Sequence, residues 1–330
     1  MMNDASLSNF QIALYRFKLQ AQSHIRLPAY AGSTLRGAFS NVFKTITCER
    51  KTGLCKNCDL IDSCPYIQIY ENSGEFCTFK LDRFKTPPKP FVIEPPVNNS
   101  TQIYEKGQEF ELRLLLIGKI LRHFPYFILA LKEMGQNGIG KTRGNFKLMK
   151  IEGLNPLNQT SGLIYDADAG TILNKEISFN LIDFIREKSK SANEINKIDV
   201  EFVTPTRIKS SGSYDNSLSF KVLIQTLLTR ITNLAYHYCD QKQTLNFRNL
   251  VNQAKRIEIV HETKEWQDIK RFQSKNNIEM FLGGYIGKIA YMGDIAPFWP
   301  WLKFGEILHI GKNCSFGLGK YQASNISESA

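Results

Sequence analysis

Apolar and polar positions follow two periods along the first half of the chain, and they predict short strands and amphipathic helices. Alternation of apolar and polar residues marks the strands, and apolar residues three and four apart mark the helices. In chain order, the predicted elements are a strand at 10–19, a helix at 32–46, strands at 76–81 and 109–117, a helix at 119–134 and a strand that ends near residue 152.

The second half repeats this order less clearly. Its predicted elements are a strand at 198–208, a long helix at 218–239, strands near 256–260 and 284–291, a short aromatic helix near 298–302 and a strand-like run at 320–322. The order βαββαβ is the ferredoxin-like arrangement. We therefore predict an α+β protein with two tandem ferredoxin-like (RRM-like) domains, at 1–157 and 176–330. Residues 158–175, rich in Asn, Gly and Asp, are expected to form the linker.

Two glycine-rich loops, at 135–144 and 305–321, have the same character and the same setting between an apolar stretch and a strand-like run. Glycine tolerates positive φ and has no Cβ, so such a backbone can approach a ligand closely. Successive amide groups with nearby lysines also form a nest that suits an anion such as phosphate. The alternative is that each loop is a hairpin end that binds nothing.

The first loop also matches the P-loop pattern G-x4-G-K-[ST] at residues 135–142. A P-loop follows a strand and opens a helix, because the N-terminus of that helix helps to hold the phosphates. Here the predicted order is reversed, with a helix before the loop and a strand after it. We therefore reject the ATPase interpretation.

The charge balance points to a class of partner. The chain has 330 residues, enough for two domains, and its 42 Lys and Arg against 31 Asp and Glu give a net charge of +11. This excess is spread along the chain, which favours a folded protein with a basic surface and nucleic acid as the leading partner. A basic enzyme that binds no nucleic acid is the alternative. The sequence carries no signal-peptide pattern and no membrane-spanning stretch, so we expect a cytoplasmic protein with no membrane partner.

Four of the seven cysteines lie close together and include one Cys-x-x-Cys; they are Cys48, Cys55, Cys58 and Cys64. Four thiolates make the ligand set of a tetrahedral zinc site, so we expect a zinc-binding insertion in the first domain. Such a closed site has no open position, so the zinc would be structural and no catalytic metal is expected. Independent reduced thiols are the alternative, because the outer spacings are looser than in a standard zinc ribbon.

Several separated stretches share features with one known family; they are 32–39, the cysteine cluster with 64–66, 87–96, 135–144, 202–209, 293–294 and 309–321. Taken in order, they resemble the CRISPR precursor-RNA-processing endoribonucleases of the RAMP superfamily. No single stretch is specific, but the ordered set spans nearly the whole chain. The resemblance implies two ferredoxin-like domains that bind CRISPR repeat RNA across a basic cleft and cut precursor crRNA once per repeat, which releases guide RNAs.

The resemblance also implies a reaction without a metal. A ribose 2′-OH attacks the adjacent phosphate and leaves a 2′,3′-cyclic phosphate and a 5′-OH. This chemistry needs a base, an acid and a cation near the phosphate, and it needs RNA because DNA lacks the nucleophile. The main alternative is a non-catalytic RAMP subunit that binds RNA beside other CRISPR effector subunits and does not cut it.

The catalytic residues of this family vary, so candidates are chosen from their positions in the chain. His309 adjoins the second glycine loop and can act as a base or an acid near neutral pH, although its apolar neighbours also fit a half-buried structural histidine. His24 and Tyr30, before the first predicted helix, and Lys44, on its polar stripe, are the second candidates. The expected RNA-binding residues are Arg36, Lys141, Arg143, Gly311, Lys312, Gly317, Gly319 and Lys320.

Overall fold

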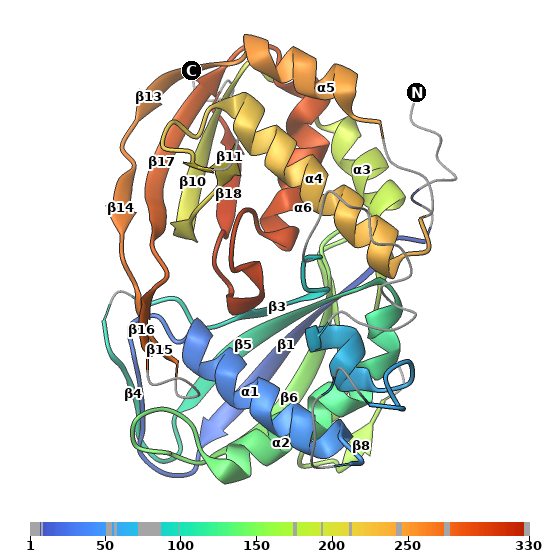
Figure 1. Ribbon diagram of the computed structural model, residues 1–330, viewed down its shortest axis with the longest axis vertical. Coiled ribbons are helices and arrows are strands. Elements are labelled where there is room, and N and C mark those ends of the chain that lie inside the picture. Colours follow the sequence, from blue (N-terminus) through green and yellow to red (C-terminus); the bar gives the residue numbers. More distant parts are fainter. Residues whose placement is uncertain are drawn as a thin grey trace. The chain divides into compact units, whose positions relative to one another are not determined.

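The computed structural model divides the chain into two compact units, which are described here one at a time (Figure 1). The N-terminal unit comprises residues 7–180 and 233–242, and the C-terminal unit consists mainly of 181–232 and 243–330. The structure describes all residues except 1–6, 8, 51–54, 56–57, 72–86, 99, 174–176, 193, 211–212, 242–245, 274–277 and 327–330.

The N-terminal unit is built on an antiparallel sheet with the strand order β3-β5-β1-β6-β7-β8, to which β9 adds by pairing with β1. The strands are β1 (Gln11–Ala21), β3 (Phe91–Glu94), β5 (Glu109–Ile117), β6 (Phe146–Asn155), β7 (Thr160–Asp166), β8 (Thr171–Ile172) and β9 (Phe179–Asn180). A separate two-stranded sheet pairs β2 (Ile25–Leu27) with β4 (Gln102–Tyr104). The central strand β1 places Tyr15 between Leu114 of β5 and Gly153 of β6.

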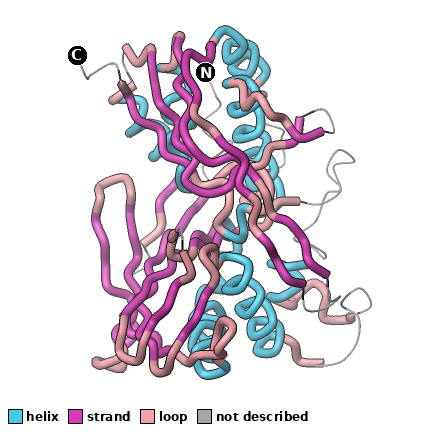
Figure 2. The backbone as a smooth tube through the Cα atoms, turned by 90° about the vertical axis from the view of Figure 1, so that its left-hand side faces the viewer, coloured by secondary structure: helices cyan, strands magenta, loops and turns pink. Residues whose placement is uncertain are grey.

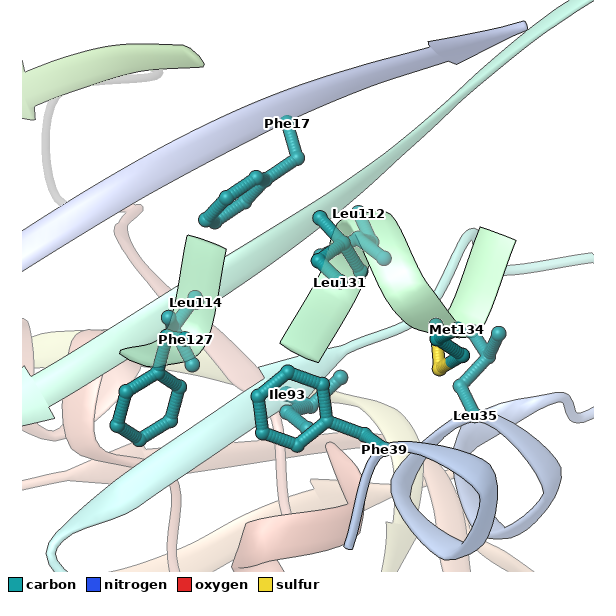
Figure 3. A pocket seen from close by; sticks show the side chains of 9 residues that line it. All are labelled: Phe17, Leu35, Phe39, Ile93, Leu112, Leu114, Phe127, Leu131 and Met134. Carbon is teal, nitrogen blue, oxygen red and sulfur yellow. The ribbon is translucent and has the colours of Figure 1, made fainter. Parts of the chain in front are cut away.

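Helices α1 (Gly32–Thr47) and α2 (Phe124–Asn137) pack on one face of this sheet. A 3-10 turn, Gly118–His123, precedes α2, and a proline sits in the first turn of α2, where no helical hydrogen bond is lost. Phe39 of α1 and Phe127 of α2 stack with their ring centroids 5.3 Å apart. A small apolar cavity remains between helices and sheet (Figure 3), lined by Phe17, Leu35, Phe39, Ile93, Leu112, Leu114, Phe127, Leu131 and Met134.

The opposite face of the N-terminal sheet carries charged side chains that pair across strands. Arg16 of β1 lies 3.3 Å from Glu152 of β6 and 3.6 Å from Glu111 of β5, and Lys18 lies 3.3 Å from Glu152. The alternation along β1 thus separates an apolar face, which packs on the helices, from a face on which the charges largely neutralise one another.

The C-terminal unit has a second antiparallel sheet, of order β13-β17-β10-β18, with β14 also pairing with β17. Its strands are β10 (Lys197–Thr206), β13 (Glu258–Glu262), β14 (Glu265–Gln267), β17 (Gly284–Met292) and β18 (Tyr321–Asn325). Two hairpins are formed by β11 (Lys209–Ser210) with β12 (Ser213–Tyr214) and by β15 (Lys270–Gln273) with β16 (Ile278–Phe281).

The helices of this unit are α3 (Leu181–Lys190), α4 (Phe220–Tyr238, of which 233–238 belong to the N-terminal unit), α5 (Arg248–Gln253) and α6 (Trp299–Leu308). Phe220 of α4 meets Tyr291 of β17 edge to face, with 5.2 Å between ring centroids, and Phe184 of α3 packs on Phe304 of α6. In both units the strands and the helices form separate layers (Figure 2). No helix of the described residues is both long enough and apolar enough to cross a membrane.

The predicted α+β class is confirmed, and most predicted elements lie within a few residues of observed ones. The predicted strand at 76–81 falls outside the described residues. The predicted linker at 158–175 is wrong, because β7 and β8 lie in it and extend the sheet beyond β6. Its Asn and Asp residues form turns between strands instead: Asn158 accepts a hydrogen bond from the backbone N–H of Thr160, and Asp166 accepts one from that of Asp168.

Two neighbouring residues of α2 test how far the N-terminal unit depends on this packing. Phe127 is fully buried, whereas Leu129 is 51 % exposed on the same helix. Phe127→Ala should lower the free energy of unfolding by about 3–5 kcal/mol, because it enlarges an existing cavity. Leu129→Ala should change it by less than about 0.5 kcal/mol. Urea unfolding of both variants checks this, and equal effects would contradict the packing described.

Candidate functional site

The first glycine loop is a tight turn bound to the segment around β2 in the N-terminal unit. The backbone N–H of Lys141 donates to the carbonyl of Arg26 at 3.1 Å. The Thr142 hydroxyl donates to the carbonyl of His24 at 3.0 Å and accepts from the backbone N–H of Arg26 at 3.1 Å. His24, Arg26 and the loop therefore form one local structure, although more than a hundred residues separate them in the chain.

The glycines of this loop make that contact sterically feasible. Gly140 has φ +74°, and a Cβ there would collide with the carbonyl oxygen of Arg26. A Cβ at Gly144 would collide with the carbonyl oxygen of His24. The space next to these two glycines is therefore filled by the protein's own backbone, whereas the sequence led us to expect a ligand there.

The second glycine loop shows the same arrangement in the C-terminal unit. The backbone N–H of Lys312 donates to the carbonyl of Arg207 at 2.9 Å, and a Cβ at Gly311, where φ is +84°, would collide with that carbonyl. A Gly-Lys pair thus contacts the carbonyl of an arginine in both units. We call these two contacts the Gly-Lys clamps; they consist of Gly140-Lys141 on Arg26 and Gly311-Lys312 on Arg207.

Further contacts hold the second loop. Thr204 of β10 donates its hydroxyl to the carbonyl of Gly317 at 3.0 Å and accepts the backbone N–H of Lys320 at 2.9 Å. The N–H of Gly319 donates to the Pro205 carbonyl at 3.2 Å. Because these amides already donate to protein acceptors, an anion near this loop would be held by side chains such as that of Lys312, which is exposed.

His309 lies beneath this loop, at the C-terminal end of α6. It is completely buried and has φ +60°, which is rare for a residue with a side chain. Its Nδ1 is 3.0 Å from the carbonyl oxygen of Leu318. The side chain therefore joins the helix end to the loop, and its burial separates it from any substrate at the surface.

His24 has the opposite environment. Its side chain is 46 % exposed, and its Nδ1 lies 2.9 Å from Oε1 of Glu105, the residue that follows β4. A carboxylate at Nδ1 favours the tautomer with the proton on that atom, so Nε2 keeps its lone pair. Glu105 is not among the residues predicted from the sequence. It is 81 residues from His24, and only the pairing of β2 with β4 brings the two together.

The polar face of α1 that includes Arg36 and Lys44 packs against two tyrosines. The guanidinium of Arg36 lies 5.3 Å from the ring centroid of Tyr70, and Nζ of Lys44 lies 5.2 Å from that of Tyr66. The two tyrosine rings stack on each other at 5.1 Å. Cation–π contact therefore orders these cations, which leaves less of their surface for a phosphate.

The protonation state of Lys44 follows from its surroundings. Partial burial lowers its pKa, but the charges of Cys55, Tyr66 and Cys48, together with that of Glu71, outweigh burial and raise the pKa overall. Lys44 is therefore a cation and cannot serve as a general base. Tyr30 lies just before α1, forms an isolated bridge with Val97 and is partly exposed.

The sequence-predicted residues thus form one group in each unit. The N-terminal unit holds His24, Tyr30, Arg36, Lys44, Lys141 and Arg143, of which His24, Lys141 and Arg143 are exposed. The C-terminal unit holds His309, Gly311, Lys312, Gly317, Gly319 and Lys320. Within the N-terminal group, the structure brings His24 and the loop of Lys141 into direct contact.

The structure does not support the predicted zinc site. Cys48, Cys55, Cys58 and Cys64 are all described as free, partly exposed thiols. Across the described part of the chain, no three His, Cys, Asp or Glu side chains gather in a way that could hold a metal ion. The segment instead folds through backbone bonds: the N–H of Cys48 donates to Lys44 at the end of α1, and the N–H of Cys64 donates to Leu60.

Two family models match the chain in order. Residues 10–177 match AF_1859_N, described as an N-terminal domain, and residues 200–321 match CRISPR_Cas6, described as CRISPR-associated endoribonuclease Cas6. Over residues 200–321 the chain is similar to the CRISPR-associated endoribonuclease Cas6. The resemblance to CRISPR-processing endoribonucleases is thereby confirmed. No curated protein matches the chain.

Solved Cas6 structures share the fold of this chain. A Cas6 product complex has a TM-score of 0.55 and 14 % identity, covering 95 % of this chain and 100 % of that chain. Thermus thermophilus Cas6 has a TM-score of 0.54 and 13 % identity, with coverages of 96 % and 99 %. The partial Cas6-RT-Cas1–Cas2 complex has a TM-score of 0.60 and 14 % identity, covering 98 % of this chain and 48 % of that chain.

The Gly-Lys clamps predict a specific sensitivity to a single methyl group. Gly140→Ala and Gly311→Ala should each lower the free energy of unfolding by about 1–3 kcal/mol, because each requires positive φ and meets a backbone oxygen that cannot rotate away. Gly37→Ala is the matched control, since a Cβ there has no atom within 4 Å. It lies inside α1 and should be neutral or stabilising by up to about 1 kcal/mol. Thermal unfolding that leaves all three equal would disprove the clamp.

Proposed function

We propose that this chain binds CRISPR repeat RNA and cuts precursor crRNA once per repeat, by metal-independent attack of a ribose 2′-OH that leaves a 2′,3′-cyclic phosphate. The match of residues 200–321 to the Cas6 endoribonuclease model supports the substrate and the reaction class. The main structural support for the proposed site is the environment of the exposed His24. Its ring contacts the Glu105 carboxylate, and its carbonyl contacts the loop that bears Lys141 and Arg143.

The strand orders support the finer description of the fold as two ferredoxin-like halves. In the N-terminal unit the order β3-β5-β1-β6 places the first and third main strands at the centre, and β13-β17-β10-β18 does the same in the C-terminal unit. Two helices, one after the first main strand and one before the last, complete each βαββαβ set. We propose this architecture, with boundaries near residue 180 rather than at 158–175.

His24 is the proposed general base. Its Nε2 takes the proton of the 2′-OH, and the imidazolium that forms is stabilised by the Glu105 carboxylate at Nδ1. Lys141 and Arg143 supply positive charge for the phosphate as it gains negative charge in the transition state. A proton must also reach the leaving 5′-oxygen, and we propose Tyr30 or the cationic Lys44 for that role. His309 is proposed as a positioning residue that fixes the second loop.

The charge distribution supports loops, and not the sheet face, as the RNA contact in the N-terminal unit. Arg16 and Lys18 on the sheet already pair with carboxylates, so little net charge remains there for phosphates. Lys141 and Arg143 form no ion pair within the described residues. One structural relative is a partial Cas6-RT-Cas1–Cas2 complex, so we propose other CRISPR proteins as further partners.

Cleavage assays test the base. His24→Ala should keep its affinity for repeat RNA and lose about 10²- to 10⁴-fold in cleavage rate, the usual contribution of proton transfer. Glu105→Gln should lose less, because the histidine remains. His261→Ala is the control, since that histidine is exposed on β13. Cleavage should persist in EDTA and stop with a 2′-deoxy substitution at the cut site.

The outcomes of these assays separate the alternatives. Full cleavage by His24→Ala would remove it as the base. Tight binding of the repeat by wild-type protein without any cut would favour the non-catalytic RNA-binding subunit. Loss of cleavage in EDTA would overturn the metal-independent mechanism.

Salt dependence tests the RNA contacts. If Lys141, Lys312 and Lys320 neutralise phosphates, the logarithm of affinity should fall steeply with the logarithm of salt concentration, because each contact releases counterions. Replacing Lys141 or Lys312 with alanine should reduce that slope by about one. Lys190→Ala is the matched control, since Lys190 pairs with Glu187 at 2.7 Å. An unchanged slope in all variants would show that the RNA contacts other residues.

A further inference from the structure

The β11–β12 hairpin of the C-terminal unit carries an exposed aromatic ring close to two cations. Tyr214 is 44 % exposed. The guanidinium of Arg207 lies 4.7 Å from its ring centroid, and Nζ of Lys209 lies 5.0 Å from it. Lys209 and Tyr214 are opposite each other in the hairpin register, so their side chains share one face. We call Arg207, Lys209 and Tyr214 the hairpin platform.

The hairpin platform is attached rigidly to the rest of the unit. Arg207 supplies the carbonyl of the second Gly-Lys clamp, which places the backbone of Lys312 next to it. Ile208, between the two cations, is only 1 % exposed. On the return strand, the N–H of Asp215 donates to the Ile208 carbonyl at 3.0 Å. The ring is thus presented from a fixed base, which lowers the entropy lost when a ligand binds.

The positive charge of the platform is not neutralised by the protein. Within the described residues, Arg207, Lys209 and Lys312 form no ion pair. Asp215 lies nearby in the chain, and its Oδ1 accepts hydrogen bonds from the backbone N–H of Leu218 at 2.7 Å and from the hydroxyl of Ser217 at 2.9 Å. The site therefore combines an exposed aromatic ring with positive charge that no ion pair of the described residues neutralises.

A flat ring joined to a phosphate fits this combination. An unpaired nucleotide can stack its base on a tyrosine while its phosphate meets arginine and lysine, whereas a base inside a duplex keeps both faces covered. We propose that the hairpin platform binds an unpaired nucleotide of RNA, with its base on Tyr214 and its phosphate at Lys209, Arg207 and Lys312. This proposal rests on the proposed RNA-processing function and adds a site for single-stranded RNA.

Binding measurements with two defined probes test it. The first probe is a fluorescein-labelled uridine oligoribonucleotide, and the second is a labelled, blunt-ended RNA duplex. Tyr214→Ala should weaken binding of the oligoribonucleotide by about 5- to 150-fold, the range for loss of one base stack. Binding of the blunt-ended duplex should change by less than about 2-fold, because it offers no unpaired base.

Conservative variants keep the test decisive if the alanine variant misfolds. Tyr214→Phe and Tyr214→Trp retain a ring and should bind the oligoribonucleotide within about 3-fold of wild type, because stacking needs a π-face and no hydroxyl. Tyr126→Ala is the control, since that tyrosine is 38 % exposed on α2 in the other unit. Lys209→Ala should flatten the salt slope for the oligoribonucleotide by about one.

The results distinguish this inference from the proposed function. Unchanged oligoribonucleotide binding by Tyr214→Ala, with repeat RNA still bound and cut, would overturn the platform alone. Equal weakening of both probes would also overturn it, because the effect would then be structural. If wild-type protein does not process repeat RNA, yet Tyr214→Ala alone loses the oligoribonucleotide, the platform stands and the proposed function fails.

Discussion

The candidate sites of this protein depend on two backbone contacts, in which the N–H of Lys141 meets the carbonyl of Arg26 and that of Lys312 meets the carbonyl of Arg207. Each requires that the preceding residue have no Cβ, because a side-chain atom would occupy the position of the arginine oxygen. A contact between backbone atoms tolerates almost no displacement, so each clamp fixes the position of its arginine and lysine together. In the N-terminal unit the same loop also positions His24, because the hydroxyl of Thr142 donates a hydrogen bond to the carbonyl of His24.

Charge is distributed differently on the sheets and on the loops, and this difference decides where a polyanion is attracted. On the N-terminal sheet, cations lie opposite carboxylates. The two charges of such a pair largely cancel, so the pair exerts little electrostatic attraction on a polyanion in solvent. Lysines next to the clamps have no such partner among the described residues, so their field extends into solvent. Exposed Lys141, Arg143 and Lys312 therefore add positive charge at the glycine loops.

Much of the fold could be predicted from the sequence, because the periodicity of apolar residues is a local property. Helices α1, α2, α4 and α6 and most of the main strands follow it, whereas α3 and β3 were not predicted. What the glycines contact could not be predicted, because a residue without a side chain lets either a ligand or another backbone segment approach closely. Only the fold shows that the carbonyl of Arg26 fills the space next to Gly140. The linker was wrong for a related reason, since Asn and Asp mark turns within a sheet as readily as turns between domains.

The two histidines show why a candidate site needs three dimensions. His309 lies beside glycines and a lysine in the sequence, which made it the stronger candidate. In the fold, however, the side chain of His309 is completely buried beneath that glycine loop. His24 has an undistinguished context, and its partner Glu105 reaches it only through the pairing of β2 with β4. A general base must exchange its proton with a substrate, so access and a fixed tautomer matter more than proximity in the sequence. On both counts the geometry favours the exposed histidine, and it gives the buried one the different task of holding a loop in place.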